Sequence, residues 1–246
     1  MKAKDSYDEI FSDIDRILVV LAHPDDMEIN CGGIIARLIS DKKEVRLVVT
    51  TSGGKGTKDK EGIQEEDFGN SRINEQIEAG KVLGIPENQN FNLKIPDGEL
   101  ETSIENIGKI VFHIREFKPD LIITHNPNEI FIDFNGNSCW VNHRDHRNTA
   151  QITVDAVYPY SRDTGFFTDQ LSQIHLETHT VTKLLIADTY TEKDVRYFKI
   201  DNFIEQKKNA LKKHISAFSP DSVGDFIEEN KYEKNYFEPL KYYKVY

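Results

Sequence analysis

Four ionisable side chains crowd one short turn near the start of the chain: His23, Asp25, Asp26 and Glu28 fall within six residues. Three carboxylates and one imidazole this close together would repel and desolvate one another unless a cation lay between them. The simplest physical interpretation is that the turn binds a metal ion. His23 and Asp26, three residues apart on a tight turn, can supply two of its ligands.

A second cluster contains His143 and His146, about one helical turn apart, with Asp145 between them. A hydrolytic zinc site uses three protein ligands with N or O donors and leaves one position open for water. One of these histidines can complete the ligand set that the first turn begins, and the other is then free to act on a substrate. The spacing does not decide which histidine does which.

The elements that must position these side chains are those of an open α/β sheet. Residues 17–22 form an apolar run with the length and branching of a buried strand, and Pro24 ends it. Gly32 and Gly33 lead into an apolar periodic run, 34–39, that predicts a helix. Open α/β sheets build ligand sites at the carboxyl ends of their strands, and a strand followed by a turn rich in ionisable groups and then a helix is typical of such a site.

Strands and helices alternate along the rest of the chain, which predicts an α/β, Rossmann-like fold with a mostly parallel sheet covered by helices on both faces. We expect one domain over residues 1–246, with a C-terminal tail from about residue 219 of unclear role. Two long irregular stretches, 55–70 and 126–140, are expected to be binding loops that set substrate choice. The further predicted strands are 45–51, 90–93, 120–124, 182–187 and 195–200, and the further predicted helices are 72–83, 104–114, 143–157 and 202–218.

The composition argues against several classes of protein. A formal net charge of −11 disfavours nucleic acid or an anionic membrane as a main partner. No apolar run approaches the roughly 20 residues that cross a bilayer, and the first residues lack the apolar region of a signal peptide. Cys31 and Cys139 form neither a disulfide framework nor a zinc-finger spacing. We therefore expect a soluble, cytoplasmic protein.

The two clusters resemble the PIG-L (LmbE-like) family, whose members are zinc enzymes that remove an acetyl group from N-acetylglucosamine-type sugars. The resemblance extends in matching order over residues 17–218 and has two specific anchors, AHPDDME at 22–28 and HRDH at 143–146. The other matching positions are Gly32-Gly33, Arg72 with Glu75, Leu83-Gly84 and Pro96-Asp97-Gly98.

The resemblance implies one Zn²⁺ per chain, held by His23, Asp26 and His146, although another divalent transition metal fits the same donors. It makes Asp25 the general base and places His143 against the substrate carbonyl. The implied function is hydrolysis of the linear amide of an N-acetylated amino sugar or sugar conjugate.

The resemblance also matches Arg72 and Asp97 to positions that contact substrate in relatives. In the implied reaction, zinc lowers the pKa of water from about 16 to about 7, and Asp25 takes the water's proton. Zinc and a protonated His143 then stabilise the charge on the carbonyl oxygen. Asp145 is expected to orient His143 or a ligand imidazole. The leaving amine gains a proton from Asp25 or His143, and the sequence does not choose between them.

Two positions depart from the family pattern. Met27 separates the aspartate pair from Glu28, which leaves the ligands untouched. Ala217 stands where many relatives have a glutamine after Ser216, so no family role is carried over to the segment after His214.

Simpler interpretations remain open for several of these side chains. Arg72 can pair with Glu75 or Gln76 instead of anchoring substrate. Asp25 can stabilise the first turn of the following helix, and Glu28 can do the same or orient a metal ligand. A second group can also have structural roles: Asp145 in a capping box behind Asn142, His125 in a structural hydrogen bond, His214 and Cys31 in packing, and His113, His175 and His179 as ordinary histidines.

Two other functions fit the sequence less well. A metal-dependent phosphoesterase could use the same ligands, but phosphate chemistry needs more cations than Arg72, Arg144 and Lys55, and often two metals. A non-catalytic Rossmann-like binding module is the third class, yet the glycines of 53–57 fit neither the dinucleotide nor the phosphate-loop pattern. The expected partner is a small N-acetylated sugar, with no nucleic acid and no membrane; a homo-oligomer is compatible with the resemblance.

Overall fold

The computed structural model describes residues 3–56, 62–133, 139–189, 193–219 and 221–246. Its strands are β1 (Arg16–Leu21), β2 (Glu44–Thr51), β3 (Asn90–Ile95), β4 (Leu121–Thr124), β5 (Phe131–Asp133), β6 (Cys139–Val141), β7 (Lys183–Ile186), β8 (Arg196–Lys199), β9 (Lys231–Tyr232) and β10 (Asn235–Lys244). Its α-helices are α1 (Tyr7–Phe11), α2 (Asp26–Ser40), α3 (Glu65–Leu83), α4 (Ile104–Phe117), α5 (Arg144–Asp155), α6 (Thr168–Ser172), α7 (Ile204–Leu211) and α8 (Val223–Glu228). Short helical turns are η1 (Glu87–Gln89), η2 (Ala156–Tyr160) and η3 (Asp201–Phe203).

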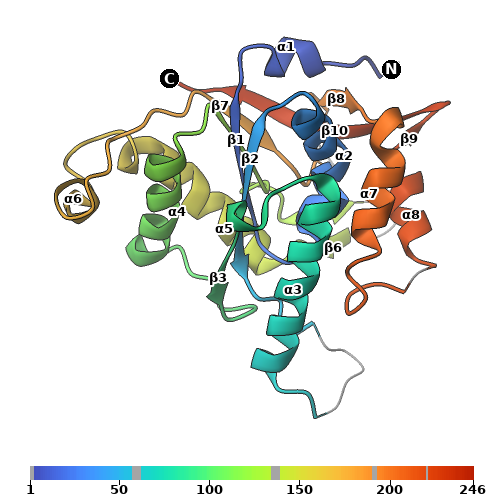
Figure 1. The fold of residues 1–246 in the computed structure, drawn as a ribbon, viewed down its shortest axis with the longest axis horizontal. Coiled ribbons are helices and arrows are strands. Elements are labelled where there is room, and N and C mark those ends of the chain that lie inside the picture. The colour runs from blue at the N-terminus through green and yellow to red at the C-terminus, as the bar shows by residue number, and fades with distance from the viewer. Residues whose placement is uncertain (1–2, 57–61, 134–138, 190–192, 220) are drawn as a thin grey trace.

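The centre of the molecule is a sheet with the spatial strand order β3-β2-β1-β4-β7-β10-β8, and β9 pairs with β10 (Figure 1). The five neighbouring strands β3, β2, β1, β4 and β7 run parallel, and β10 runs antiparallel to both β7 and β8. The predicted α/β fold with a mostly parallel sheet is therefore confirmed.

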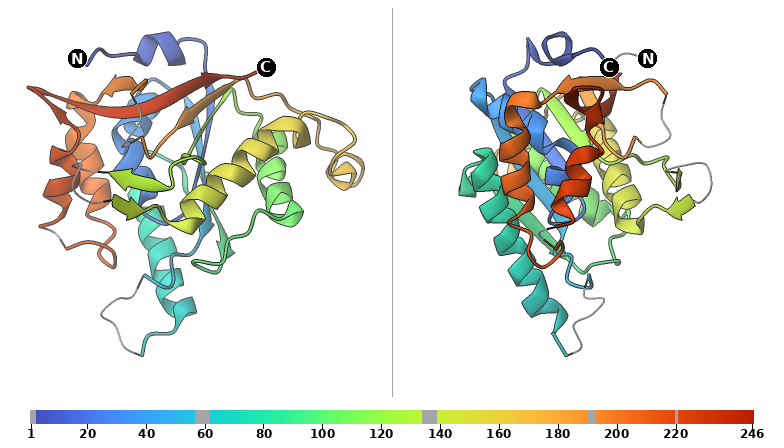
Figure 2. Two further views of the ribbon diagram at one scale, coloured as in Figure 1. Left: turned by 180° about the vertical axis from the view of Figure 1, so that it is seen from behind. Right: turned by 90° about the vertical axis from the view of Figure 1, so that its right-hand side faces the viewer.

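The two faces of the sheet alternate along each strand, as the side-chain period of two requires. In β1, Ile17, Val19 and Leu21 pack into one core with residues of α2, α3 and α7, whereas Leu18 and Val20 pack into a second core with residues of α4 and α5. An edge-on view shows these helices on opposite sides of the strands (Figure 2). Both faces are covered, which explains why the strand sequences are almost continuously apolar.

Several predicted boundaries differ from the structure. The predicted loop 55–70 is shorter, because α3 begins at Glu65 and not at residue 72; residues 57–61 of that loop lie outside the described residues. The second loop, 126–140, contains the hairpin of β5 and β6, and its residues 134–138 lie outside the described residues. The predicted helix over 202–218 ends at Leu211.

The C-terminal tail, for which the sequence predicted no structure, contributes α8, β9 and the long strand β10. Pro239 lies inside β10, and a proline within a sequence argues against a central strand because it cannot donate to the ladder. β10 still joins the sheet, because its residues 237–240 pair with β8, with Pro239 opposite Tyr197, and its residues 241–244 pair with β7.

A buried ion pair joins β10 to a kink in α2. Cys31 has non-helical φ and ψ of −147° and 16°, which frees backbone groups on both sides of the kink. The Glu238 carboxylate accepts hydrogen bonds from two N–H groups of the following half-helix, at 2.9 and 2.7 Å. Lys207 Nζ donates to the carbonyl of Ile29 at 2.8 Å and to Glu238 at 2.7 Å. The C-terminal strand thus completes the helix that follows the ionisable turn.

We expect Glu238→Ala to lower the free energy of unfolding by about 3–5 kcal/mol, because it leaves a buried ammonium group and two buried N–H groups without their carboxylate. Urea denaturation measures the change. The control is Glu228→Ala, whose carboxylate pairs with Lys231 at the surface and is expected to contribute about 1 kcal/mol or less. Equal effects of the two substitutions would contradict the expectation.

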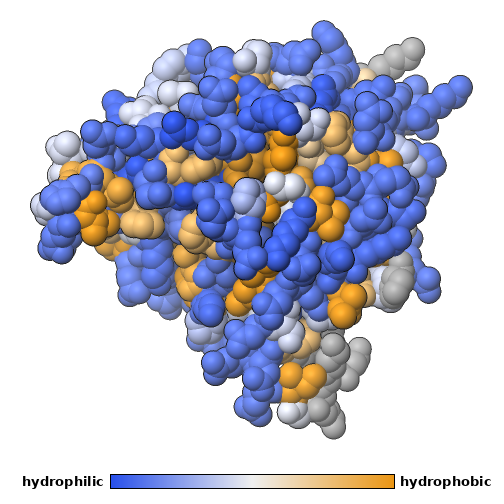
Figure 3. Space-filling view, in the orientation of Figure 1, coloured by the Kyte–Doolittle hydropathy of each residue, from blue (hydrophilic) through white to orange (hydrophobic). Residues whose placement is uncertain are grey.

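The face of the molecule shown in Figure 3 is mainly hydrophilic, with apolar residues in separate groups. Within the part of the chain that the structure describes, no helix combines the length and apolarity needed to span a bilayer.

Candidate active site

The candidate site lies at the carboxyl edge of the parallel strands, where the strand order changes direction. β4 lies on one side of β1, whereas β2 and β3 lie on the other. A switch of this kind leaves a crevice outside the strand ends, where open α/β sheets bind ligands. His23 follows β1, Asp97 follows β3, His125 follows β4 and Asp188 follows β7, so side chains from four strand ends meet there.

Three side chains from distant parts of the sequence converge in this crevice. His146 Nε2 lies 3.2 Å from His23 Nδ1 and 3.4 Å from Asp26 Oδ1. His23 Nδ1 lies 3.5 Å from Asp26 Oδ2. Ligand atoms about 2.0–2.1 Å from a tetrahedral zinc ion lie about 3.3 Å from one another, so this donor set fits such an ion. The structure therefore brings together the three residues predicted as metal ligands.

The other nitrogen of each of these imidazoles faces a carboxylate. His23 Nε2 lies 3.3 Å from Asp97 Oδ1 and 3.5 Å from Asp145 Oδ2. His146 Nδ1 lies 3.5 Å from Asp188 Oδ2. Carboxylates in this position fix the tautomer and the orientation of a metal-binding imidazole. The two histidines are thus oriented to present one nitrogen each toward the same point.

His125 lies beside this group, but both of its nitrogens are occupied by the protein. Its Nε2 accepts a hydrogen bond from the N–H of Ala22 at 3.0 Å, and its Nδ1 lies 2.7 Å from Asp188 Oδ2. Its ring stacks on that of His146, with centroids 4.0 Å apart. His125 therefore makes the structural hydrogen bonds that the sequence predicted and supports a ligand candidate from behind.

Carboxylates dominate the electrostatics of the crevice. Burial lowers the pKa of His146, but Asp26 and Asp188 outweigh burial and raise this pKa to about 10. Burial also opposes protonation of His23, yet the surrounding carboxylates, above all Asp145, raise its pKa well above the ordinary value. The carboxylates thus favour positive charge in the crevice, which a bound divalent cation would supply.

Asp25 lies next to the ligand candidates in sequence, and Arg72 holds its carboxylate. Its backbone has φ of 115° and ψ of −26°, in the left-handed region that residues other than glycine rarely adopt. Arg72 Nη2 donates to Asp25 Oδ2 at 2.6 Å. Burial raises the pKa of Asp25 to about 6, against the opposing effect of Arg72. The carboxylate makes no capping hydrogen bond to α2, so the simpler interpretation as a helix cap does not describe this residue.

Arg72 does not form the ion pair with Glu75 that was one of its two predicted interpretations. Its guanidinium is buried and donates to the carbonyl oxygens of Gly53 at 3.0 Å and of Pro24 at 2.6 Å, besides the Asp25 carboxylate. A Cβ on Gly53 would lie 2.5 Å from Arg72 Nη1, so glycine is required for this close approach. The contacts of Arg72 therefore place it behind Asp25 as a support.

The start of α5 is capped by His143 and not, as the sequence predicted, by Asn142. His143 Nδ1 accepts a hydrogen bond from the N–H of Asp145 at 3.2 Å, whereas the Asn142 side chain donates to a carbonyl oxygen outside the helix. The Asp145 carboxylate accepts from the N–H of Gly98 at 2.6 Å and lies 4.0 Å from His143 Nδ1. Its 3.5 Å contact with His23 Nε2 is shorter, so of the two predicted partners it lies closer to the imidazole of the ligand candidate.

His143 is the most accessible imidazole of the group, with 47% of its side chain exposed and its ring centroid 4.6 Å from that of His23. Burial lowers its pKa, and the neighbouring imidazoles of His23 and His146 lower it further. A lowered pKa works against the protonated form of His143 that the sequence predicted. Because Nδ1 accepts the capping hydrogen bond, the proton of the neutral ring lies on Nε2 and can be donated in a hydrogen bond.

Asp188 is the site residue that sequence reasoning missed. It immediately follows the predicted strand 182–187, in the same relation as His23 to the first strand, and this position was the available signal. Glu28 does not have the predicted helix-capping role, because its carboxylate contacts Gln76 and His214.

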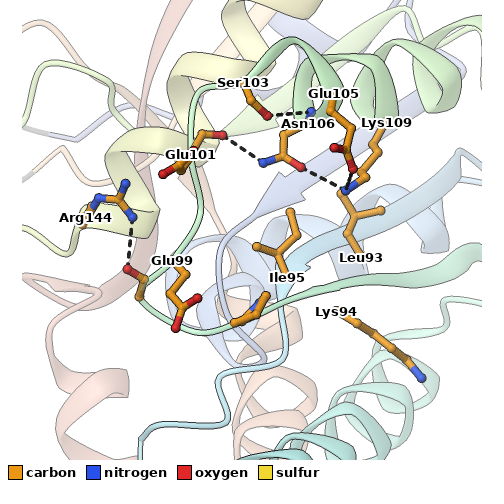
Figure 4. A pocket seen from close by; sticks show the side chains of 12 residues that line it. Leu93, Lys94, Ile95, Glu99, Glu101, Ser103, Glu105, Asn106, Lys109 and Arg144 are labelled. Atoms are coloured by element: carbon orange, nitrogen blue, oxygen red, sulfur yellow. Dashed lines mark hydrogen bonds and ion pairs between the residues drawn. The ribbon is translucent and has the colours of Figure 1, made fainter.

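A polar cavity of about 590 Å³ opens beside the turn that carries Asp97 (Figure 4). Arg144 Nη1 donates to the carbonyl of Gly98 at 3.0 Å, and the N–H of Gly98 donates to Asp145. The backbone of one residue, Gly98, therefore joins the cavity wall to the crevice that contains His23. The charged residues of the lining are Lys94, Glu99, Glu101, Glu105, Lys109 and Arg144.

The fold and the site together define an α/β protein with a doubly wound sheet. At its switch point one carboxylate and two imidazoles form a candidate metal site beside a polar cavity. Residues 18–157 match the family described as PIG-L: GlcNAc-PI de-N-acetylase. The chain belongs to this family, which confirms the resemblance found in the sequence.

Relatives of known name support the same assignment. The chain is 26% identical over 220 residues to diacetylchitobiose deacetylase of Thermococcus kodakarensis, covering 89% of this chain and 76% of the relative. It is 27% identical over 134 residues to 1D-myo-inositol 2-acetamido-2-deoxy-alpha-D-glucopyranoside deacetylase of Streptomyces avermitilis, covering 46% of each. The structure of N,N'-diacetylchitobiose deacetylase from Pyrococcus horikoshii superposes with a TM-score of 0.82 at 25% identity, covering 95% of this chain and 85% of that one.

Proposed function

We propose that this protein is a zinc-dependent N-deacetylase that hydrolyses the acetamide of an N-acetylated amino sugar or sugar conjugate. The observation that carries the proposal is the convergence of His23, Asp26 and His146 with the Asp25 carboxylate beside them. The relatives described above are named for acetylated aminosugar substrates, which favours the same class of substrate here. We expect one zinc ion per chain.

The residues around the ligand candidates have different roles in the proposed amide hydrolysis. When bound, zinc would supply Lewis acidity and lower the pKa of water from about 16 to about 7. Asp25, held by Arg72, accepts the proton of the attacking water. His143 donates a hydrogen bond from Nε2 to the carbonyl oxygen as negative charge develops there. Asp145 keeps His23 in the orientation that the ligand set needs.

The polar cavity is the proposed site for the rest of the sugar. Sugar hydroxyl groups both donate and accept hydrogen bonds, and the lining offers carboxylates as acceptors and the cations Lys109 and Arg144 as donors. Asp97, which the resemblance matched to a substrate contact, lies 3.3 Å from His23 Nε2, and its sequence neighbours Pro96 and Gly98 line the cavity. We therefore place the acetamide at the crevice and the sugar ring toward the cavity.

Acetate release from N,N'-diacetylchitobiose and N-acetylglucosamine tests the function, together with the zinc content of the purified protein by mass spectrometry. We expect about one zinc ion per chain, loss of acetate release with a chelator, and recovery on adding zinc. Full activity of metal-stripped protein would overturn the proposed mechanism. A phosphomonoester substrate serves as the second arm, because its cleavage in place of the amides would favour the phosphoesterase alternative.

We expect Asp188→Asn to weaken zinc binding about 10–100-fold, because it removes the charge that faces Nδ1 of His146. Competition with a chromophoric chelator measures the affinity. Asp194→Asn, which changes a carboxylate that is 86% exposed, is the control and should leave the affinity unchanged. Equal affinities of the wild type and Asp188→Asn would show that Asp188 has only a packing role.

A further inference from the structure

A chain of buried polar groups runs from Asp25 to the segment after α7. The N–H of Asp25 donates to Gln76 Oε1 at 3.0 Å, and Gln76 Nε2 donates to Glu28 Oε1 at 3.0 Å. The second oxygen of Glu28 lies 3.1 Å from His214 Nε2. Gln76 is 2% exposed, and Glu28 and His214 are fully buried. Side-chain hydrogen bonds from Gln76 through Glu28 to His214 therefore link α3, α2 and the C-terminal part of the molecule.

The two hydrogen bonds of Gln76 have defined directions. Its NH₂ group donates to Glu28 Oε1, which leaves its carbonyl oxygen as the acceptor for the N–H of Asp25. The other oxygen of Glu28 is paired with His214 Nε2. Burying a carboxyl group is unfavourable unless its partners are well placed, which indicates a requirement more specific than filling space.

The feature that requires these partners is the backbone conformation of Asp25. Left-handed φ and ψ are unfavourable for a residue with a side chain, and such a conformation persists only where the surroundings enforce it. Arg72 holds the carboxylate of Asp25 and the preceding carbonyl, and Gln76 holds the N–H. Without Gln76 this N–H would be buried with no acceptor.

We propose that Gln76, Glu28 and His214 are positioning residues, which hold the backbone of Asp25 in the conformation that directs its carboxylate toward the metal-binding crevice. The proposal rests on the proposed function for the role of Asp25 as the base. A positioning role differs from a purely structural role in what a substitution changes. Loss of a contact that only holds two helices together lowers stability, whereas loss of a positioning contact also lowers kcat selectively.

Gln76→Met tests the link nearest to Asp25, because methionine has a similar size and cannot accept the hydrogen bond. A shift of about 1 Å in a reacting group costs about 10²-fold in rate, so we expect kcat for acetate release to fall by about 10–100-fold. KM and zinc content should stay within about twofold of the wild type. The matched control is Gln206→Met, which removes a 2.8 Å hydrogen bond from α7 to the carbonyl of Val82 in α3 without touching Asp25.

Two substitutions at Glu28 test the next link. Glu28→Gln can still accept from Gln76, and its NH₂ group can donate to His214 in the other tautomer. Glu28→Leu can do neither. We therefore expect Glu28→Gln to keep a larger share of kcat than Glu28→Leu. Equal loss in both variants at equal thermal stability and zinc content would overturn the proposal.

Crystal structures of the zinc-loaded wild type and Gln76→Met decide the matter without a substrate. We expect the Asp25 carboxylate to move by more than about 0.5 Å, the tolerance of a catalytic group, or its φ to leave the left-handed region. An unchanged Asp25 in Gln76→Met overturns the positioning role whatever the kinetics show. If the wild type released no acetate from any N-acetylated sugar, the proposed function would fail, and this comparison would still decide whether Gln76 positions Asp25.

Discussion

Asp25→Asn is expected to lower kcat for acetate release by about 10²–10⁴-fold, the contribution of a well-placed general base. The amide keeps the size of the carboxylate and can still accept a hydrogen bond from Arg72, but it cannot take a proton at neutral pH. Zinc content and KM should change little, because Asp25 is not one of the three ligand candidates. Steady-state kinetics and metal analysis of the same preparation measure both effects.

The pH dependence provides a second measurement of the same residue. Burial raises the pKa of Asp25 to about 6, and zinc beside it would lower this value. A base must be deprotonated to act, so wild-type kcat should fall as the pH drops through this pKa, and the residual activity of Asp25→Asn should lack this acid limb. The exposed Asp8 on α1 gives the control Asp8→Asn. An Asp25→Asn variant that kept most of the wild-type rate would remove Asp25 from the role of base.

His146→Ala is expected to weaken zinc binding by more than about 100-fold, because loss of a supporting residue around a metal ligand alone costs about 10–100-fold. His146 is the only one of the three ligand candidates that comes from α5, so its removal leaves the donors of the first turn to bind the ion alone. Acetate release should fall in proportion to the bound zinc at any given zinc concentration.

The chain contains a matched control for this substitution. His143 is the residue before α5, and its ring centroid lies 5.7 Å from that of His146. We expect His143→Ala to retain about one zinc ion per chain while kcat falls, because His143 is the proposed hydrogen-bond donor to the carbonyl oxygen. If His143→Ala lost the zinc and His146→Ala retained it, the two assignments would have to be exchanged.

Much of the fold could be predicted because its signals are local. The apolar run 17–22 has the length of a strand buried on both faces, and the strand, turn and helix order of 17–39 predicts a parallel sheet. The C-terminal strand β10 could not be predicted, because Pro239 and the charged residues around it oppose a strand locally. Its place in the sheet depends on pairing with β7 and β8, which lie far away in the sequence.

The sequence by itself determined that the turn after the first strand and the start of a later helix carry metal-ligand donors, because residue types and their spacing define the chemistry that such segments can support. The resemblance to the PIG-L family then selected His23, Asp26 and His146 as ligand candidates and Asp25 as the base. Only the tertiary structure decided that Arg72 supports Asp25 and that Asp188 faces His146. Only it showed that Glu28 is joined to His214. These partners come from segments with no fixed spacing in the chain, and the packing of the helices and strand ends around the switch point brings them within a few ångströms of one another.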